Sequence, residues 1–311
     1  MLRAVIGKEL TSRLQGRLAF VILTLLVAAF TGLVIAGFWM IVLNVPTLIP
    51  AIGTSTGAGA PSVTIQSLVA SSRGVFLFVT LSICSAAAVL AVAPAVASSA
   101  LSSEREAGTH DLLLGTGMPA SALIFGKLVG AVAFVLLMSL TTVPGFAIAW
   151  MFGGVSPRDA LMALALLLST VLFISACGIL ISSLVQSSVL ASLYCYGIAF
   201  MLGYGTLLLY VVGASIQNEA IVRPVLAFNP FVALATIPDQ LAGQVAQTMP
   251  FQYRAMLDLS SQEYLGMSLK YPRWINTLSV YLIGTIVMAG MATIAADPCH
   301  RLRPRSGPGR E

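Results

Sequence analysis

The sequence predicts an all-α integral membrane protein with six transmembrane helices, and two observations support this fold class. Of the 311 residues, 58% are hydrophobic and only 9% are charged, whereas about a quarter of the residues in a soluble domain are charged. Six apolar runs are each long enough to cross hydrocarbon as a helix, which takes about 20 residues. These runs are residues 18–43, 74–100, 122–152, 158–184, 190–215 and 274–296.

Residues 1–17 have the pattern of an amphipathic helix. Their apolar side chains recur at helical spacing, while charged and hydroxyl side chains occupy the rest of the wheel. The apolar positions are Val5, Ile6, Leu10 and Leu14. We expect this helix to lie in the membrane interface. The run that follows, 18–43, is too long for the core of a signal peptide, so we interpret it as an uncleaved span.

The distribution of lysine and arginine predicts the orientation. Six spans place both termini on one side, together with the 101–121 loop and the basic tail 297–311. The loops 44–73 and 216–273 would share the other side, and they carry fewer basic residues per length. The positive side is expected to be cytoplasmic. Because the basic residues of this chain (net charge +5) cluster at span ends, we predict no nucleic-acid partner.

Two outer segments differ in composition. Residues 44–73 are rich in Gly, Ser, Thr and Pro, so at least their first half is predicted to be a flexible loop. Residues 216–273 are moderately apolar and are divided by prolines. These are Pro224, Pro230, Pro238, Pro250 and Pro272. We expect short interfacial helices between them rather than a folded domain.

Several kinds of chemistry are missing from the apolar runs. None has a charged residue or a histidine in its interior, because Lys127, Arg158 and Asp159 lie at the edges of their runs; this disfavours an ion-coupled carrier. The only histidines, His110 and His300, fall at predicted cytoplasmic positions, so haem ligation within the spans and an intramembrane Ser–His protease are excluded. The sequence has no G-x-x-x-x-G-K-[ST] loop for ATP. We therefore predict no catalytic residue and no cofactor on this chain.

The cysteines indicate packing rather than metal binding or disulfides. They form no CxxC pair, and no cluster of metal ligands accompanies them. The four are Cys84, Cys177, Cys195 and Cys299. We interpret them as small apolar residues and predict no metal site.

Small residues and prolines indicate where helices pack closely or bend. Gly126 and Gly130 form a GxxxG pattern at the start of the third span, and small residues allow close helix contact in lipid. Pro94 and Pro144 are expected to kink the second and third spans.

Glycines and tyrosines in the fifth span allow two interpretations. Gly203 could serve intrachain packing, or the span could form a dimer interface or line a translocation path. In the second case Tyr196 and Tyr204 would contact the cargo or the second chain.

The segment 101–121 carries most of the charge between Gly74 and Gly154. Its ionic side chains cannot cheaply enter hydrocarbon, so the segment must lie in water between two spans. A triplet of leucines, Leu112, Leu113 and Leu114, follows the charges. A charged loop with such a triplet is typical of a docking element for a soluble partner.

Residues 103–116 (SEREAGTHDLLLGT), followed by residues 126–131 (GKLVGA), resemble the signature of type-2 ATP-binding-cassette (ABC-2) export permeases, which are type V exporter-like. In that family an E-R-E-x-G-T-x-[DE]-L-L-L stretch follows the second span and G-K-L opens the third. Lys8–Leu10 is similar to the connecting helix, and Gly153–Asp159 resembles the turn before the fourth span. The resemblance is strongest to the branch associated with multi-copper enzyme maturation and gliding motility.

The resemblance implies the membrane-spanning subunit of an ATP-driven exporter in a bacterial-type plasma membrane. A separate P-loop ATPase would carry ATP and Mg, a second permease chain would complete a homo- or heterodimer, and this chain would not be an enzyme. The loop would contain a cytoplasmic coupling helix. The implied ATPase-coupling residues are Glu104, Arg105, Glu106, Gly108, Thr109, Asp111, Leu112, Leu113 and Leu114. The leucines would fill an apolar groove on the ATPase, and the acidic residues would meet basic ones.

Two other functions remain as alternatives. The chain could be a secondary carrier that works alone on an ion gradient, or a non-transporting scaffold that recruits a partner through the same loop. The absence of charged residues inside the spans favours coupling to an external ATPase over the carrier. The sequence predicts no particular cargo.

Overall fold

The computed structural model describes residues 62–108, 120–215, 228–238, 263–264, 267–268 and 273–296, together with scattered positions between residues 7 and 39. Five helical units in this part are long and apolar enough to cross a membrane. They coincide with the predicted second to sixth spans. The predicted interfacial helix and the first span lie largely outside the described residues, as do Thr109, His110 and the segment 111–119.

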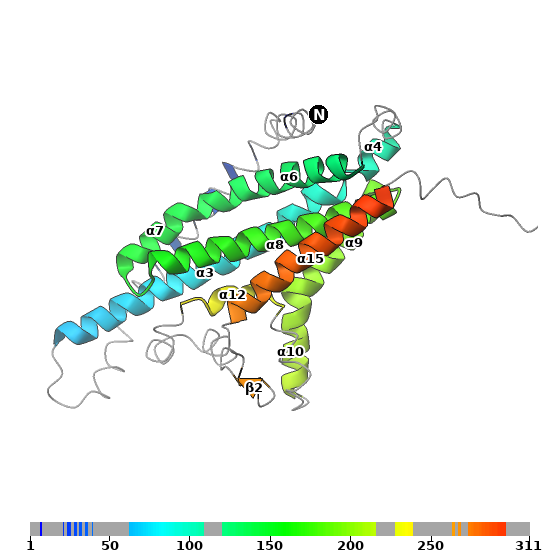
Figure 1. The fold of residues 1–311 in the computed structure, drawn as a ribbon. Helices are drawn as coiled ribbons and strands as arrows, with labels where there is room; N and C mark the ends of the chain where they lie inside the picture. The colour runs from blue at the N-terminus through cyan, green and yellow to red at the C-terminus, as the bar shows by residue number, and fades with distance from the viewer. Residues whose placement is uncertain are drawn as a thin grey trace, which may run out of the picture.

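The five units follow the predicted order, with breaks inside two of them. Their elements are α3 (Ser62–Ser98), α6 (Ala120–Ser139), η1 (Leu140–Thr142), α7 (Val143–Phe152), α8 (Pro157–Leu184), α9 (Ser188–Phe200), η2 (Met201–Gly205), α10 (Thr206–Ser215) and α15 (Arg273–Ala296). Figure 1 shows α8 in the middle of the bundle, where it contacts α3, α6, α9 and α15. The core therefore surrounds α8, while α9, α10 and α15 keep many apolar side chains exposed, as lipid-facing helices do.

α3 is longer than the apolar run that predicts it. It begins at Ser62, so the second half of the predicted 44–73 loop is helical. A helix that is anchored by its buried part can continue beyond it, because each added residue gains one backbone hydrogen bond. Pro94 lies inside α3, which continues unbroken to Ser98.

The turn before α8 has the local features that its sequence predicts. Gly153 and Gly154 have φ of 85° and 80°, a left-handed conformation that glycine adopts without strain. Ser156 and Asp159 then form a reciprocal capping box: Ser156 Oγ accepts from Asp159 N at 3.2 Å, and Asp159 Oδ2 accepts from Ser156 N at 2.8 Å. These residues set the start of α8 at Pro157.

Two spans contain irregular turns. The third changes from α6 to α7 through the 3₁₀ turn η1, which ends immediately before Val143 and Pro144, where a kink is predicted. The fifth contains η2, a π-helical turn that includes Gly203 and Gly205. Such π segments occur often at functional sites. The apolar run 190–215 predicts no break at this position.

The segment 216–273 supplies one short helix and the only strands among the residues that are described. The strands β1 (Glu263–Tyr264) and β2 (Met267–Ser268) pair in antiparallel fashion, a small exception to the all-α prediction. The helix α12 (Pro230–Ala235) is buried at every residue. The expectation of an interfacial helix is therefore wrong for α12, because its apolar residues pack against α3, α8 and α15 instead of lipid headgroups.

The cysteines behave as the sequence predicts where the structure describes them. Cys177 and Cys195 are buried, Cys84 is half-buried, and all three are free thiols. Cys299 lies outside the described residues.

Candidate functional site

The short helix α4 (Ser102–Glu106) forms the centre of the candidate site. It follows α3 after a turn at residues 99–101, and it lies at the end of the bundle beside the start of α6 (Figure 1). Gly108 follows with φ of 68°, a conformation that glycine adopts without strain. α4 contains Glu104, Arg105 and Glu106, three of the predicted ATPase-coupling residues.

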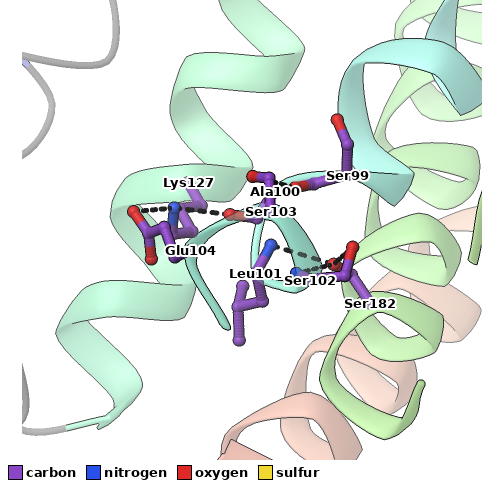
Figure 2. Close-up of polar contacts among 8 residues, drawn as sticks. All are labelled: Ser99, Ala100, Leu101, Ser102, Ser103, Glu104, Lys127 and Ser182. Atoms are coloured by element: carbon purple, nitrogen blue, oxygen red, sulfur yellow. Dashed lines mark hydrogen bonds and ion pairs between the residues drawn. The ribbon is translucent and has the colours of Figure 1, made fainter. Parts of the chain in front are cut away.

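Ser182 of α8 holds the start of α4. Its hydroxyl oxygen accepts hydrogen bonds from the backbone amides of Leu101 at 2.8 Å and of Ser102 at 2.9 Å, and all three residues are buried (Figure 2). The N-cap residue of α4 is Leu101, whose side chain cannot accept a hydrogen bond. Ser182 thus supplies from another helix the acceptor that a capping side chain normally supplies locally.

A glycine allows α8 to approach α3 closely enough for these bonds. A Cβ atom at Gly178 would lie 2.7 Å from the Cβ of Ala97 and 3.1 Å from the amide nitrogen of Ser98. Gly178 is one helical turn before Ser182, so the close contact brings the Ser182 hydroxyl to the end of α3. This is the close packing that small residues permit in membrane helices.

Lys127 of α6 forms a buried ion pair with α4. Its Nζ donates to Glu104 Oε1 at 2.7 Å and to the backbone oxygen of Ala100 at 2.7 Å (Figure 2). Only 3% of the Lys127 side chain is exposed, against 20% of Glu104. Lys127 is predicted to lie at the cytoplasmic edge of a span, but its charge is buried, because the end of α3 and α4 cover it.

Arg105 connects α4 to the C-terminal end of α8. Its Nη1 donates to the backbone oxygen of Ser183 at 2.8 Å and, at a longer 3.5 Å, to that of Ser182. The last carbonyl groups of a helix have no partner within the helix and carry partial negative charge. The Arg105 guanidinium group supplies both a hydrogen-bond donor and a positive charge to the carbonyl groups at this helix end.

Glu106 connects α4 to the N-terminal end of α9. Its Oε1 accepts from the backbone amide of Ser188 at 2.8 Å, and its Oε2 accepts from the Ser188 hydroxyl at 2.8 Å. These two hydrogen bonds lower the pKa of the Glu106 carboxyl below its usual value, so the group is ionised at neutral pH. A carboxylate at the positive end of α9 is favourably placed.

α4 is therefore bound to three helices that are distant in sequence. Glu104 contacts α6, Arg105 contacts α8, and Glu106 contacts α9. These three charged residues all have partners within the chain, and the sequence pattern does not predict these partners. Their contact with an ATPase stays a prediction, as does that of Thr109 and of 111–114, which lie outside the described residues.

The residues predicted to contact cargo or a second chain, Tyr196, Gly203 and Tyr204, lie at a different location from α4, on α9 and η2. Gly203 is buried, and a Cβ there would lie 2.7 Å from Leu90 Cδ1 and 3.1 Å from the Phe231 ring, so this glycine serves packing within the chain. Tyr196 donates to the backbone oxygen of Ala91 at 3.0 Å. The Tyr204 ring packs edge-on against Phe231 with centroids 5.5 Å apart. A role in dimer contact or translocation stays a prediction.

Three serines that complete the α4 site are not among the residues that the sequence predicts for it. Ser182, Ser183 and Ser188 lie at or next to the junction of α8 and α9, and each gives a hydroxyl or a backbone atom to the contacts of α4. A signal exists in the stretch 181–192 (ISSLVQSSVLAS), where small polar residues gather at the end of an apolar run. Their partners are about 80 positions away, which periodicity does not reveal.

Comparison with protein families matches residues 54–295 to the ABC-2 family of transporter proteins. The match covers most of the chain, so this protein belongs to the ABC-2 transporter family. Together with the five apolar helices, it identifies a multi-pass membrane permease of an ABC transporter. No curated protein is significantly similar in sequence. Among the described residues, no group of three His, Cys, Asp or Glu side chains could hold a metal ion.

Proposed function

We propose that this chain is the permease subunit of an ATP-driven exporter, and that a separate P-loop ATPase with bound ATP and Mg drives it through α4 and the loop that follows. In this proposal the chain is not an enzyme and carries no cofactor. It works with a second permease chain, with both termini in the cytoplasm and the spans in a bacterial-type plasma membrane. Membership of the ABC-2 family supports the class of function.

The observation that carries the proposal is the set of contacts that α4 makes with three helices. A helix of five residues has little stability of its own. Here the buried ion pair to α6, the guanidinium contact to α8 and the carboxylate contact to α9 hold it in position. A force applied next to α4 therefore reaches these spans together rather than bending a free loop.

The proposed sequence of events follows from this arrangement. The leucines Leu112, Leu113 and Leu114 dock in an apolar groove of the ATPase, and Asp111 meets a basic residue beside it. Gly108 lets the chain turn from α4 towards this docking segment. When ATP closes the two ATPase subunits, the docking segments move, and α4 passes the displacement to α6, α8 and α9.

The branch associated with multi-copper enzyme maturation is part of the proposal, and it rests on sequence motifs alone, chiefly the one at residues 103–116. It does not define the cargo. The part of the chain that the structure describes contains no cluster of metal-ligating side chains. We therefore do not propose copper as the transported substrate.

The test is copurification of this chain in detergent with a P-loop ATPase encoded in the same operon, followed by an ATPase assay of the complex. We expect a stable complex that hydrolyses ATP. Leu113→Asp should release the ATPase, because a charge cannot enter an apolar groove without a partner. Leu113→Met, of similar volume, should keep it. Normal copurification of Leu113→Asp would contradict the docking model, and a chain that binds no ATPase would contradict the function itself.

A further inference from the structure

Asn229 is a fully buried polar side chain in the apolar bundle, with 0% exposure. Its Nδ2 donates to the backbone oxygen of Gly203 at 2.7 Å and to Thr206 Oγ1 at 2.6 Å. Its Oδ1 accepts from the amides of Phe231 at 2.8 Å and Val232 at 3.2 Å. One amide group thus caps the start of α12 and also binds the π-helical segment η2 and the start of α10.

The contact on η2 falls where the backbone of the fifth span departs from α-helical geometry. A π-helical turn shifts the hydrogen bonds of the backbone, and side chains complete the pattern here. The backbone oxygen of Gly203 accepts a hydrogen bond from Asn229 Nδ2. The Thr206 hydroxyl donates to the backbone oxygen of Leu202 at 2.9 Å. Gly203 also has no side chain that would displace the Phe231 ring of α12. The π turn and α12 are therefore complementary in shape and in hydrogen bonding.

α12 depends on its surroundings for its position. A helix of six residues is not stable alone, so its packing against α3, α8 and α15 and its end contacts hold it. One contact is Asn229. A second lies just before it, where the Tyr281 hydroxyl of α15 donates to the backbone oxygen of Phe228 at 2.6 Å. Of these two, only Asn229 connects α12 to the fifth span.

The fifth span also links the two sites. Its α9 begins at Ser188, which binds Glu106 of α4, and it continues into η2, which binds Asn229. A displacement of α4 that pulls on the start of α9 therefore arrives at the π turn. Because π and α turns differ by one residue in their bonding register, a small shift there changes which carbonyl group faces Asn229.

We propose that Asn229 is a positioning residue for transport: its amide latches α12 to the π turn and keeps this buried apolar helix inside the bundle in the resting state. Release of the latch lets α12 move out of the bundle. The link from ATP to this release rests on the proposed function, whereas the latch itself is a property of this chain alone.

The test measures the exposure of α12 with a water-soluble maleimide. Ala235, which is 1% exposed, becomes cysteine in a full-length chain whose four native cysteines are replaced. Asn229→Ser separates the two functions of the amide: serine is a good N-cap residue, but it is too short to replace the bond to η2. Thr206→Val removes one acceptor of the latch and keeps the side-chain shape.

We expect slow labelling of the parent chain. Labelling should be at least about tenfold faster in Asn229→Ser, and it should increase to a smaller extent in Thr206→Val, because each loses buried hydrogen bonds to the amide. A cysteine at Ala199 of α9, which is 2% exposed, should stay protected in all variants. Unchanged labelling at position 235 would overturn the proposal. Equal acceleration at positions 199 and 235 would also overturn it, since Asn229 would then stabilise the whole fold.

A second arm uses the complex with the ATPase. ATP should accelerate labelling at position 235 in the parent chain and should add little in Asn229→Ser, whose latch is already open. If the complex hydrolyses ATP and labelling does not change, the link from ATP to the latch is wrong and the proposed function stands. If no ATPase binds, the proposed function fails, and the nucleotide-free comparison still decides whether the latch exists.

Discussion

The buried ion pair between Lys127 and Glu104 allows an asymmetric prediction. The two charges are 2.7 Å apart, but only 3% of the lysine side chain reaches solvent, against 20% of the glutamate. Glu104→Leu leaves an ammonium group that water barely reaches. Lys127→Met leaves a carboxylate that can turn towards water, and a backbone oxygen at Ala100 that loses its donor at 2.7 Å. The two single changes should therefore differ in cost.

The magnitudes follow from the burial of each remaining group. Breaking a buried pair from one side costs about 3–5 kcal/mol, which we expect for Glu104→Leu. We expect about 1–3 kcal/mol for Lys127→Met, mainly from the orphaned Ala100 oxygen. The double variant leaves no charge behind, so it should return to within about 2 kcal/mol of the parent chain.

The assay is reversible unfolding in mixed detergent–SDS micelles, from which a double-mutant cycle gives the coupling energy. Ser103→Ala is the control, since its exposed hydroxyl bonds only within its own turn, to Ser99 O at 2.6 Å, and its loss should change stability by less than about 0.5 kcal/mol. Additive single changes would refute the pairing. A larger cost for Lys127→Met than for Glu104→Leu would refute the reasoning from burial.

The same variants separate two roles of Glu104. If its main role is the intrachain pair, the stable double variant should bind the ATPase as the parent chain does. If Glu104 contacts the ATPase directly, as the family resemblance implies, the double variant should regain stability and still fail to copurify.

Two further changes test the contact between α8 and α3. Ser182→Ala should cost about 1–2 kcal/mol of unfolding free energy, because two buried amides at the start of α4 lose their acceptor. Ser183→Ala is the matched control and should cost less, because the Ser183 hydroxyl bonds only within α8. Gly178→Ala should lower the thermal midpoint by the equivalent of about 1–3 kcal/mol, because the new Cβ would lie 2.7 Å from Ala97. Gly197→Ala, with no atom within 4 Å of the new Cβ, should be neutral or stabilising, and an equal loss in both glycine variants would contradict the packing argument.

Local sequence determines much of the bundle. The apolar runs predict five helices close to their observed positions. In lipid every backbone polar group needs a hydrogen-bond partner, and a long apolar segment supplies these partners within itself only as a helix. The start of α8 follows from Gly153, Gly154 and the capping box of Ser156 and Asp159, which involve neighbouring residues only. The motif at residues 103–116 and the run of spans likewise predict the ABC-2 family that the comparison shows.

Tertiary structure alone decides the partners of the polar residues. From sequence, Glu104, Arg105 and Glu106 form a solvated docking surface; in the fold they bind α6, α8 and α9. These partners are 23 to 82 positions away in the sequence, and the helical periodicity of a segment does not predict contacts at such separations. The same holds for Asn229, which lies in the predicted outer segment 216–273 and is fully buried against η2 in the fold.

The difference has one physical cause. Burial of apolar surface in lipid is roughly additive along the chain, so composition and run length suffice to predict which segments form spans. A hydrogen bond or an ion pair depends on atoms that meet within about 3 Å, and that geometry exists only after the helices have packed. The sequence by itself therefore determines the class of protein and its spans, while the packed bundle decides which charges brace α4 and which amide holds α12.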